Sequence, residues 1–197
     1  MGNNDSFRSA RSKILRRSVL VNAVQEAKTR GKTVVLTNGC FDILHVGHLR
    51  YLEQARALGD LLVVGVNSDD SVRRLKGPDR PIVREFERVE VLAALECVDY
   101  VTIFTEDTPV ELILAVKPHI HVKGGDRRPE EMPEREAVLS VGGRIEIVSY
   151  TSTDSEGLST TAIIGRITQN AETKGSKIIE DTIWSDHINV DLQKIQG

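Results

Sequence analysis

His45 and His48 form an H-x-G-H motif with Gly47, at the point where an apolar β-type run gives way to a helix-type pattern. An imidazole donates directed hydrogen bonds to phosphate, and the first turn of a helix adds free backbone N–H groups and partial positive charge. Glycine has no side chain, so Gly47 allows a ligand to approach the backbone closely. The motif therefore predicts a phosphate-binding site, while two buried or capping histidines without a chemical role are the alternative.

The elements that must position this motif alternate between strands and helices. Apolar runs predict strands near 33–38, 61–67, 100–104, 119–123 and 144–149, and the run LLVVGV is apolar on both faces, as in a buried parallel sheet. Helical spacing predicts helices near 18–30, 46–58, 87–97, 109–116, 130–141 and 159–169. We therefore expect an α/β fold, a Rossmann-like doubly wound parallel sheet of five strands.

Three polar segments follow strands of this predicted sheet. They run from Thr37 to His48, from Asn67 to Lys76 and from Lys123 to Asp126. The second segment, which ends at Lys76, is expected to be a loop. Ligands of doubly wound sheets bind at the carboxyl ends of the strands, so these segments are expected to meet at one edge. A further segment, GLSTTAII, is typical of a loop leading into a helix, with Ser159 as the N-cap.

Composition narrows the class of protein. The chain has 197 residues, 40% of them hydrophobic and 28% charged, with a net charge of −3, which argues against nucleic-acid binding. No apolar run approaches the ~20 residues of a membrane span, and the N-terminus lacks a secretory pattern. Two cysteines are too few for a disulfide framework or a zinc site, so we expect reduced thiols and a cytoplasmic protein. Residues 1–15 are expected to be loose, within an extension and helix over 1–30, followed by one domain over 31–169 and a tail over 170–197.

Five segments in order resemble one known family. They are GCFDILHVGHLRYLEQARALGD, VGVNSDDSVRRLKGPDRP, EVLAALECVDYV, VKGGD and GLSTTAII. The first resembles the signature of the nucleotidyltransferase superfamily. Together, over about residues 30–168, they resemble the adenylyltransferase domain of the bacterial heptose-phosphate enzymes. The resemblance implies transfer of AMP from ATP to D-glycero-β-D-manno-heptose 1-phosphate, giving ADP-heptose and pyrophosphate for lipopolysaccharide or a related glycan. It also implies Mg²⁺ paired with ATP, without metal-ligating residues of the protein.

The resemblance also assigns roles to residues. Catalytic roles fall to His45, His48 and Lys76, which would neutralise charge on the phosphates. Nucleotide binding falls to Asn38, Gly39, Cys40, Phe41, Gly47, Arg88, Lys123, Gly124, Gly125, Asp126, Ser159, Thr160 and Thr161. Asp42 and Asn67 are expected to bind the sugar phosphate. Two alternatives stay open: Asp42 would instead order the turn, and Arg88 would instead lie on a solvated helix face. The family usually has an aromatic residue after Asp126, and Arg127 in its place puts a stacking contact there in question.

Two other functions stay open at this stage. One is a cytidylyltransferase acting on glycerol 3-phosphate or another polyol phosphate, whose family resembles the chain less well in the KGGD segment. The other is a regulatory protein that binds a nucleotide without turnover. ATP and a sugar phosphate are the expected partners, with no nucleic acid and no membrane, in a homo-oligomer of two or more subunits. No sugar kinase is expected to be fused to the domain.

Overall fold

The computed structural model describes residues 9–125, 128–148 and 159–174, and the chain divides into two compact units, residues 1–156 and 157–197. The first unit holds a parallel sheet of five strands in the order β3-β2-β1-β4-β5. The strands are β1 (Val34–Gly39), β2 (Leu61–Asn67), β3 (Tyr100–Phe104), β4 (Ile120–Gly124) and β5 (Arg144–Val148). The predicted doubly wound α/β fold is confirmed, and each strand lies within one residue of its predicted range.

Strand β1 lies at the centre of the sheet and pairs with β2 on one side and β4 on the other. The chain passes from β1 directly to β2 and then β3, and only afterwards returns to β4 on the opposite side of β1. The direction of strand order therefore reverses between β1 and β4. In doubly wound sheets, the crevice outside the carboxyl ends of such a strand pair is where ligands bind.

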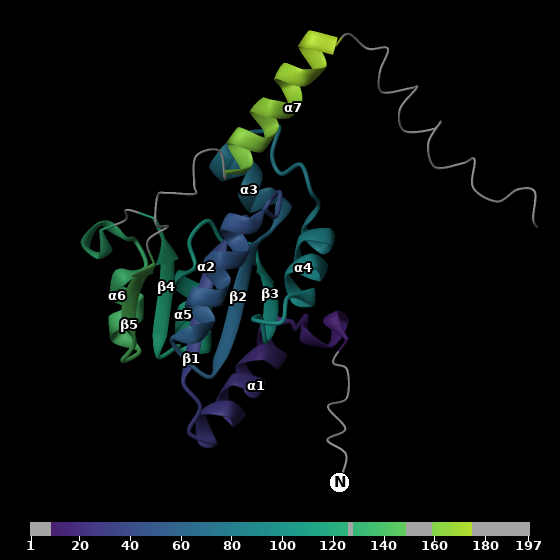
Figure 1. Cartoon of the computed structure of the whole chain (residues 1–197). Coiled ribbons are helices and arrows are strands. Elements are labelled where there is room, and N and C mark those ends of the chain that lie inside the picture. Colours follow the sequence, from purple (N-terminus) through teal and green to yellow (C-terminus); the bar gives the residue numbers. More distant parts are fainter. Residues whose placement is uncertain (1–8, 126–127, 149–158, 175–197) are drawn as a thin grey trace, which may run out of the picture. The chain divides into compact units, whose positions relative to one another are not determined.

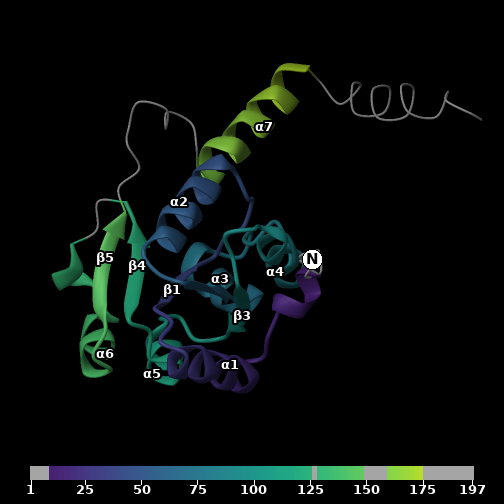
Figure 2. The ribbon, with the colours of Figure 1, turned by 60° about the horizontal axis from the view of Figure 1, so that its bottom comes forward.

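Helices cover both faces of the sheet (Figures 1 and 2). The helices that bury apolar residues on one face are α2 (Val46–Ala57) and α4 (Glu85–Ala94). The helices that do so on the other face are α1 (Arg17–Thr29), α5 (Val110–Val116) and α6 (Arg135–Ser140). Successive residues of a strand point to opposite faces, so Val34 and Leu36 pack with α1, α5 and α6 while Val35 packs with α2 and α4. This double burial explains why the strands are apolar throughout.

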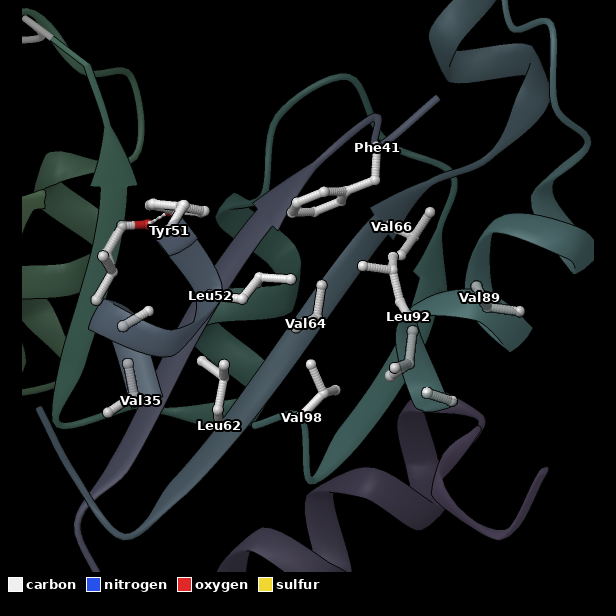
Figure 3. Packing of buried hydrophobic residues seen from close by; sticks show 14 of the residues in the cluster. Val35, Phe41, Tyr51, Leu52, Leu62, Val64, Val66, Val89, Leu92 and Val98 are labelled. Atoms are coloured by element: carbon white, nitrogen blue, oxygen red, sulfur yellow. Dashed lines mark hydrogen bonds between the residues drawn. The ribbon is translucent and has the colours of Figure 1, made fainter. Parts of the chain in front are cut away.

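The layer between α2 and the sheet also contains a polar side chain that hydrogen-bonds to two strands. Leu52 and Val64 are fully buried there (Figure 3), and the Tyr51 hydroxyl lies at the same layer. That hydroxyl donates to the Val122 carbonyl oxygen of β4 at 2.9 Å and is hydrogen-bonded to the Thr37 hydroxyl of β1. One side chain of α2 therefore connects β1 and β4 on this face.

Several expectations about local structure are wrong. Residues 10–13 form the 3₁₀ helix η1 (Ala10–Lys13), and Ile14 pairs with Val101 of β3, so the C-terminal part of the segment 1–15 is ordered. The segment after β2 is not a loop but the helix α3 (Asp69–Lys76), with Ser68 as its N-cap.

Two helix boundaries also differ. In the region of the predicted helix 130–141, the structure has the short helix η2 (Pro129–Glu131) and then α6. Helix α7 (Thr160–Lys174) belongs to the second unit and continues beyond the predicted residue 169. The tail expected from residue 170 therefore begins inside a helix. Among the described helices, none has the length and apolar character needed to cross a bilayer.

Candidate active site

The two motif histidines lie at the start of α2, where the loop after β1 ends. His45 is the N-cap residue, with extended backbone angles of φ −143° and ψ 169°, and His48 lies in the first turn. Their ring centroids are 3.9 Å apart and their planes are inclined by 32°. The structure thus brings both imidazoles to the carboxyl end of β1, as the sequence predicts for their position.

Both imidazoles are neutral at neutral pH. Burial, followed by the charge that His45 would carry, lowers the pKa of His48 to about 4. Burial likewise lowers the pKa of His45. The Nδ1 atoms of both rings are buried without a hydrogen-bond partner among the described residues. An unpaired buried polar atom costs free energy, which a ligand that hydrogen-bonds to the ring would offset.

The turn before α2 is shaped by Phe41. Its backbone has φ 47°, in the left-handed region, and its ring is buried 5.3 Å from the His48 ring. A Cβ on Gly39 would lie 3.2 Å from the Phe41 ring, so the glycine leaves room for that ring. Phe41 therefore supports His48 from the core, and its predicted nucleotide contact, like those of Gly39 and the buried Gly47, stays a prediction.

Asp42 is almost fully buried and its carboxylate has three partners within the chain. It accepts hydrogen bonds from Arg80 Nε at 2.6 Å and from the backbone N–H groups of Ile82 and Val83 at 2.8 and 2.9 Å. Burial alone would raise the pKa of Asp42, but these N–H groups and the Arg80 charge outweigh it and lower the pKa. Of the two roles left open by the sequence, this geometry supports ordering of the loop, and a sugar contact stays a prediction.

Arg88, in the first half of α4, is a buried connector of three segments. Its guanidinium donates to the carbonyl oxygens of Val83 at 3.0 Å and of Cys40, and to Asp69 Oδ1 at 2.7 Å. Its side chain has no exposed area, so it is not on a solvated helix face. It fixes the turn at Cys40, whereas the predicted contact with a nucleotide is untested.

Lys76 is the last residue of α3 and is exposed to solvent. Burial raises the pKa of the Cys40 thiol in the turn after β1, and the positive charges of Lys76, Arg88 and Arg80 oppose that shift. The neighbouring Arg74 is held by Asp107 at 2.7 Å. Lys76 therefore lies on a helix rather than on the predicted loop, with its charge acting on Cys40, and its role as a phosphate clamp stays a prediction.

The carboxyl end of β2 is occupied by an internal contact. The Asn67 side-chain amide donates to Ser71 Oγ at 2.9 Å, and Ser71 Oγ donates to the Glu106 carbonyl oxygen at 3.0 Å. Asn67 is buried, so this contact ties β2 to the start of α3. Its predicted role in substrate binding stays a prediction.

The KGGD segment lies at the carboxyl end of β4. It contacts Glu134, a residue that the sequence reasoning missed. Lys123 Nζ donates to Asn38 Oδ1 of β1 at 2.6 Å and lies 3.0 Å from Glu134 Oε1. Gly125 has φ 93°, a backbone angle that favours glycine, and its N–H donates to the Val148 carbonyl oxygen at 3.2 Å. Asp126 and Arg127 lie outside the described residues.

The STT segment begins α7 in the second unit. Ser159 Oγ accepts a hydrogen bond from the Ala162 N–H at 3.1 Å, which confirms the predicted N-cap. The predicted contacts of Ser159, Thr160 and Thr161 with a triphosphate stay predictions. Over the described ranges of both units, His, Cys, Asp and Glu side chains form no group of three or more that would hold a metal ion.

Comparison with known proteins agrees with this geometry. Residues 36–166 match the family model of the cytidylyltransferase-like proteins. The bifunctional protein HldE of Pelobacter propionicus is 59% identical over 156 residues, which are 79% of this chain and 31% of that protein. HldE of Chromohalobacter salexigens is 54% identical over 150 residues, 76% of this chain and 31% of that protein. The chain thus spans less than a third of the length of these two curated relatives.

Solved structures give the same result. A lipopolysaccharide core biosynthesis protein from Thermoplasma volcanium is 34% identical with a TM-score of 0.52, covering 63% of this chain and all of that one. Pantothenate synthetase from Thermus thermophilus shares the fold, with a TM-score of 0.53 at 18% identity over 82% of this chain and 70% of that one. The family model covers most of the first unit, from β1 through β5, and reaches into α7. The chain belongs to the cytidylyltransferase-like family.

Proposed function

We propose that the protein is a nucleotidyltransferase that joins AMP from ATP to D-glycero-β-D-manno-heptose 1-phosphate, releasing pyrophosphate. The observation that carries the proposal is the close pair of neutral imidazoles at the start of α2, which follows β1, the strand at which the strand order reverses toward β4. The matches to bifunctional HldE proteins and to a lipopolysaccharide core biosynthesis protein support the heptose phosphate as acceptor.

Neutral histidines suit this reaction. An oxygen of the sugar phosphate attacks the α-phosphorus of ATP, the new P–O bond forms, and the bond to the β-phosphate oxygen breaks. The second pKa of a phosphate monoester is about 6, so the attacking oxygen is already ionised at neutral pH and needs no general base. His45 and His48 would instead donate N–H groups to phosphate oxygens as charge develops on them.

Other residues would neutralise or orient the phosphates. Lys76 is exposed at the end of α3 and its charge acts on Cys40 of the turn after β1, so its ammonium would reach the outer phosphates as a mobile clamp. A divalent cation, which we propose is Mg²⁺, would reduce the repulsion between ATP and the acceptor. Since no carboxylate cluster occurs among the described residues, the phosphates of ATP themselves would hold that ion.

A screen of pyrophosphate release tests the proposal. Four nucleoside triphosphates are each combined with heptose 1-phosphate, other sugar phosphates and glycerol 3-phosphate, with His48→Ala as the control for contaminating activity. We expect release with ATP and heptose 1-phosphate, and identification of ADP-heptose by mass. Release only with CTP and glycerol 3-phosphate would establish the cytidylyltransferase alternative, and nucleotide binding without release would establish a regulatory protein.

We propose further that the protein is a cytoplasmic homo-oligomer. Ile82 and Phe86, near the start of α4, have exposed fractions of 57% and 70%, and a contact with a second copy of the chain would remove these apolar side chains from water. The mass of the protein in solution tests this, and a monomer at micromolar concentration would contradict it.

A further inference from the structure

A buried polar cluster lies on the face of the sheet opposite the histidines. It consists of Asn38, His121, Lys123 and Glu134. Asn38 has the same orientation as Leu36 in β1, and His121 and Lys123 alternate along β4, so all three point toward the face that α6 covers. Glu134 is the N-cap residue of α6.

The contacts of this cluster converge on one carboxylate oxygen. Glu134 Oε1 lies 3.0 Å from Lys123 Nζ and 3.4 Å from His121 Nε2. Lys123 Nζ also donates to Asn38 Oδ1 at 2.6 Å. The exposed fractions of the His121, Glu134 and Lys123 side chains are 0%, 4% and 13%, so the ion pair is removed from water.

Electrostatics keep Glu134 ionised. Burial alone would raise the pKa of Glu134, but the hydrogen bond from His121 and the charge of Lys123 outweigh it and lower the pKa to about 2. Burial lowers the pKa of His121, although Glu134 opposes that shift. At neutral pH the cluster therefore contains one carboxylate, one ammonium and a neutral imidazole, and the Lys123 charge is already balanced within the protein.

The Lys123–Asn38 hydrogen bond crosses the strand pair at which the order of the sheet reverses. β1 and β4 end there, and Tyr51 ties the same two strands from the other face. The separation of their carboxyl ends is thus fixed from both faces. A ligand bound at this edge of the sheet would meet strand ends held at a set spacing.

We propose that Glu134 is a positioning residue of the nucleotide site. It holds the Lys123 ammonium against Asn38 and thereby sets the spacing of the crevice that receives ATP. The inference rests on the proposed function, which places a nucleotide at this edge. Stability alone is a poor explanation, because a buried ion pair seldom stabilises a fold more than packed apolar residues would.

The test compares Glu134→Gln with Glu136→Gln, an exposed glutamate on the same helix. The dissociation constant of ATP is measured by calorimetry well below the melting temperature, and KM and kcat are measured separately. We expect Glu134→Gln to weaken ATP binding by about tenfold and to raise KM more than it lowers kcat, while Glu136→Gln leaves both constants unchanged. A lower melting temperature with an unchanged dissociation constant would overturn the inference and leave Glu134 a stabilising residue only.

A double-mutant cycle tests whether Glu134 acts through Lys123. If it does, Lys123→Met combined with Glu134→Gln binds ATP no more weakly than Lys123→Met alone. Additive losses would overturn the inference. Should Glu134→Gln not fold, the variant with Met at both positions removes both charges of the ion pair together, and we expect that variant to fold and to bind ATP about tenfold more weakly than the unsubstituted protein.

Nucleotide binding separates this inference from the proposed reaction. A protein that binds ATP but releases no pyrophosphate with any acceptor would refute the proposed function, while the effect of Glu134→Gln on ATP binding would still decide the inference. A protein that binds no nucleotide at all would overturn both.

Discussion

Replacement of Arg88 by methionine separates a structural role from a nucleotide contact. Methionine replaces the aliphatic part of the arginine side chain but has no charge and no hydrogen-bond donor. The change removes the bonds to the Cys40 and Val83 carbonyl oxygens and to Asp69. Each of those groups belongs to a different segment around the site, so the loss falls on the turn after β1 and on the loop before α4.

The magnitude follows from burial. Removing one partner of a buried charge pair costs about 3–5 kcal/mol, because the remaining charge is left without compensation. The Asp69 side chain is 21% exposed, so water would rehydrate it in part, which favours the lower half of that range. The two carbonyl groups left without a hydrogen bond add to the cost. A domain of this size loses roughly 2–4 °C of melting temperature per kcal/mol, so we expect Arg88→Met to melt roughly 6–20 °C lower.

The assay is urea unfolding of Arg88→Met, Arg88→Lys and the control Arg73→Met. Within the part of the chain that the structure describes, the exposed Arg73 side chain forms an ion pair with Asp70 alone. We expect the control to lose less than about 0.5 kcal/mol and the lysine variant to be intermediate, because an ammonium cannot reproduce a three-way fork. If Arg88→Met unfolds within about 1 kcal/mol of the unsubstituted protein, the reasoning from its buried hydrogen bonds is refuted. Normal stability with lost ATP binding would instead support the nucleotide contact that the resemblance implies.

Three further predictions concern the ionisable side chains of the site. His48→Ala is expected to lower kcat by roughly 10²–10³-fold, with a smaller effect on ATP binding, and near-normal kcat in a folded variant would make this histidine structural. Lys76→Ala is expected to lower kcat more than Arg74→Ala, since Arg74 is held by Asp107, and equal losses would mean that Lys76 is not the phosphate clamp. Stability is expected to fall on acidification, because the pKa of His48 is about 4 in the folded protein and has its ordinary value of 6.5 in the unfolded chain. Between these pH values the unfolded state binds more protons. The stability is therefore full above pH 6.5 and declines toward pH 4, which urea midpoints at pH 7 and pH 5 would show, with a smaller difference in His48→Gln.

The sheet and the histidine motif were predictable because their signals are local. Each strand is a continuous apolar run, and the H-x-G-H residues follow the first of them directly. Helix α3 was missed because it is short and strongly charged, with only Ser71 and Val72 buried. Its start is marked by Ser68, whose side chain accepts from the Ser71 N–H, a capping signal that the sequence does contain.

The polar contacts around the site were not predictable from the sequence. Glu134 meets Lys123 because α6 begins over β4, and Arg88 meets the Cys40 carbonyl oxygen because α4 packs beside the turn after β1. Such pairings depend on the register of the sheet and the placement of helices, which no spacing in the sequence encodes. Asp42 was predicted near the site. Its hydrogen bonds from the Ile82 and Val83 N–H groups were not, for the same reason.

The short pairing of Ile14 with Val101 has a practical consequence for handling the protein. An exposed edge strand is a template for aggregation, and here the chain's own N-terminal segment covers part of the β3 edge, with the Leu15 N–H donating to the Val101 carbonyl oxygen at 2.9 Å. Val101 lies near the beginning of β3, at the end of the sheet remote from the carboxyl ends of the strands. Truncation beyond Leu15 would therefore expose this part of the β3 edge to pairing with another chain. Expression vectors that start the chain at α1 are expected to yield less soluble protein than those that keep residues 9–15.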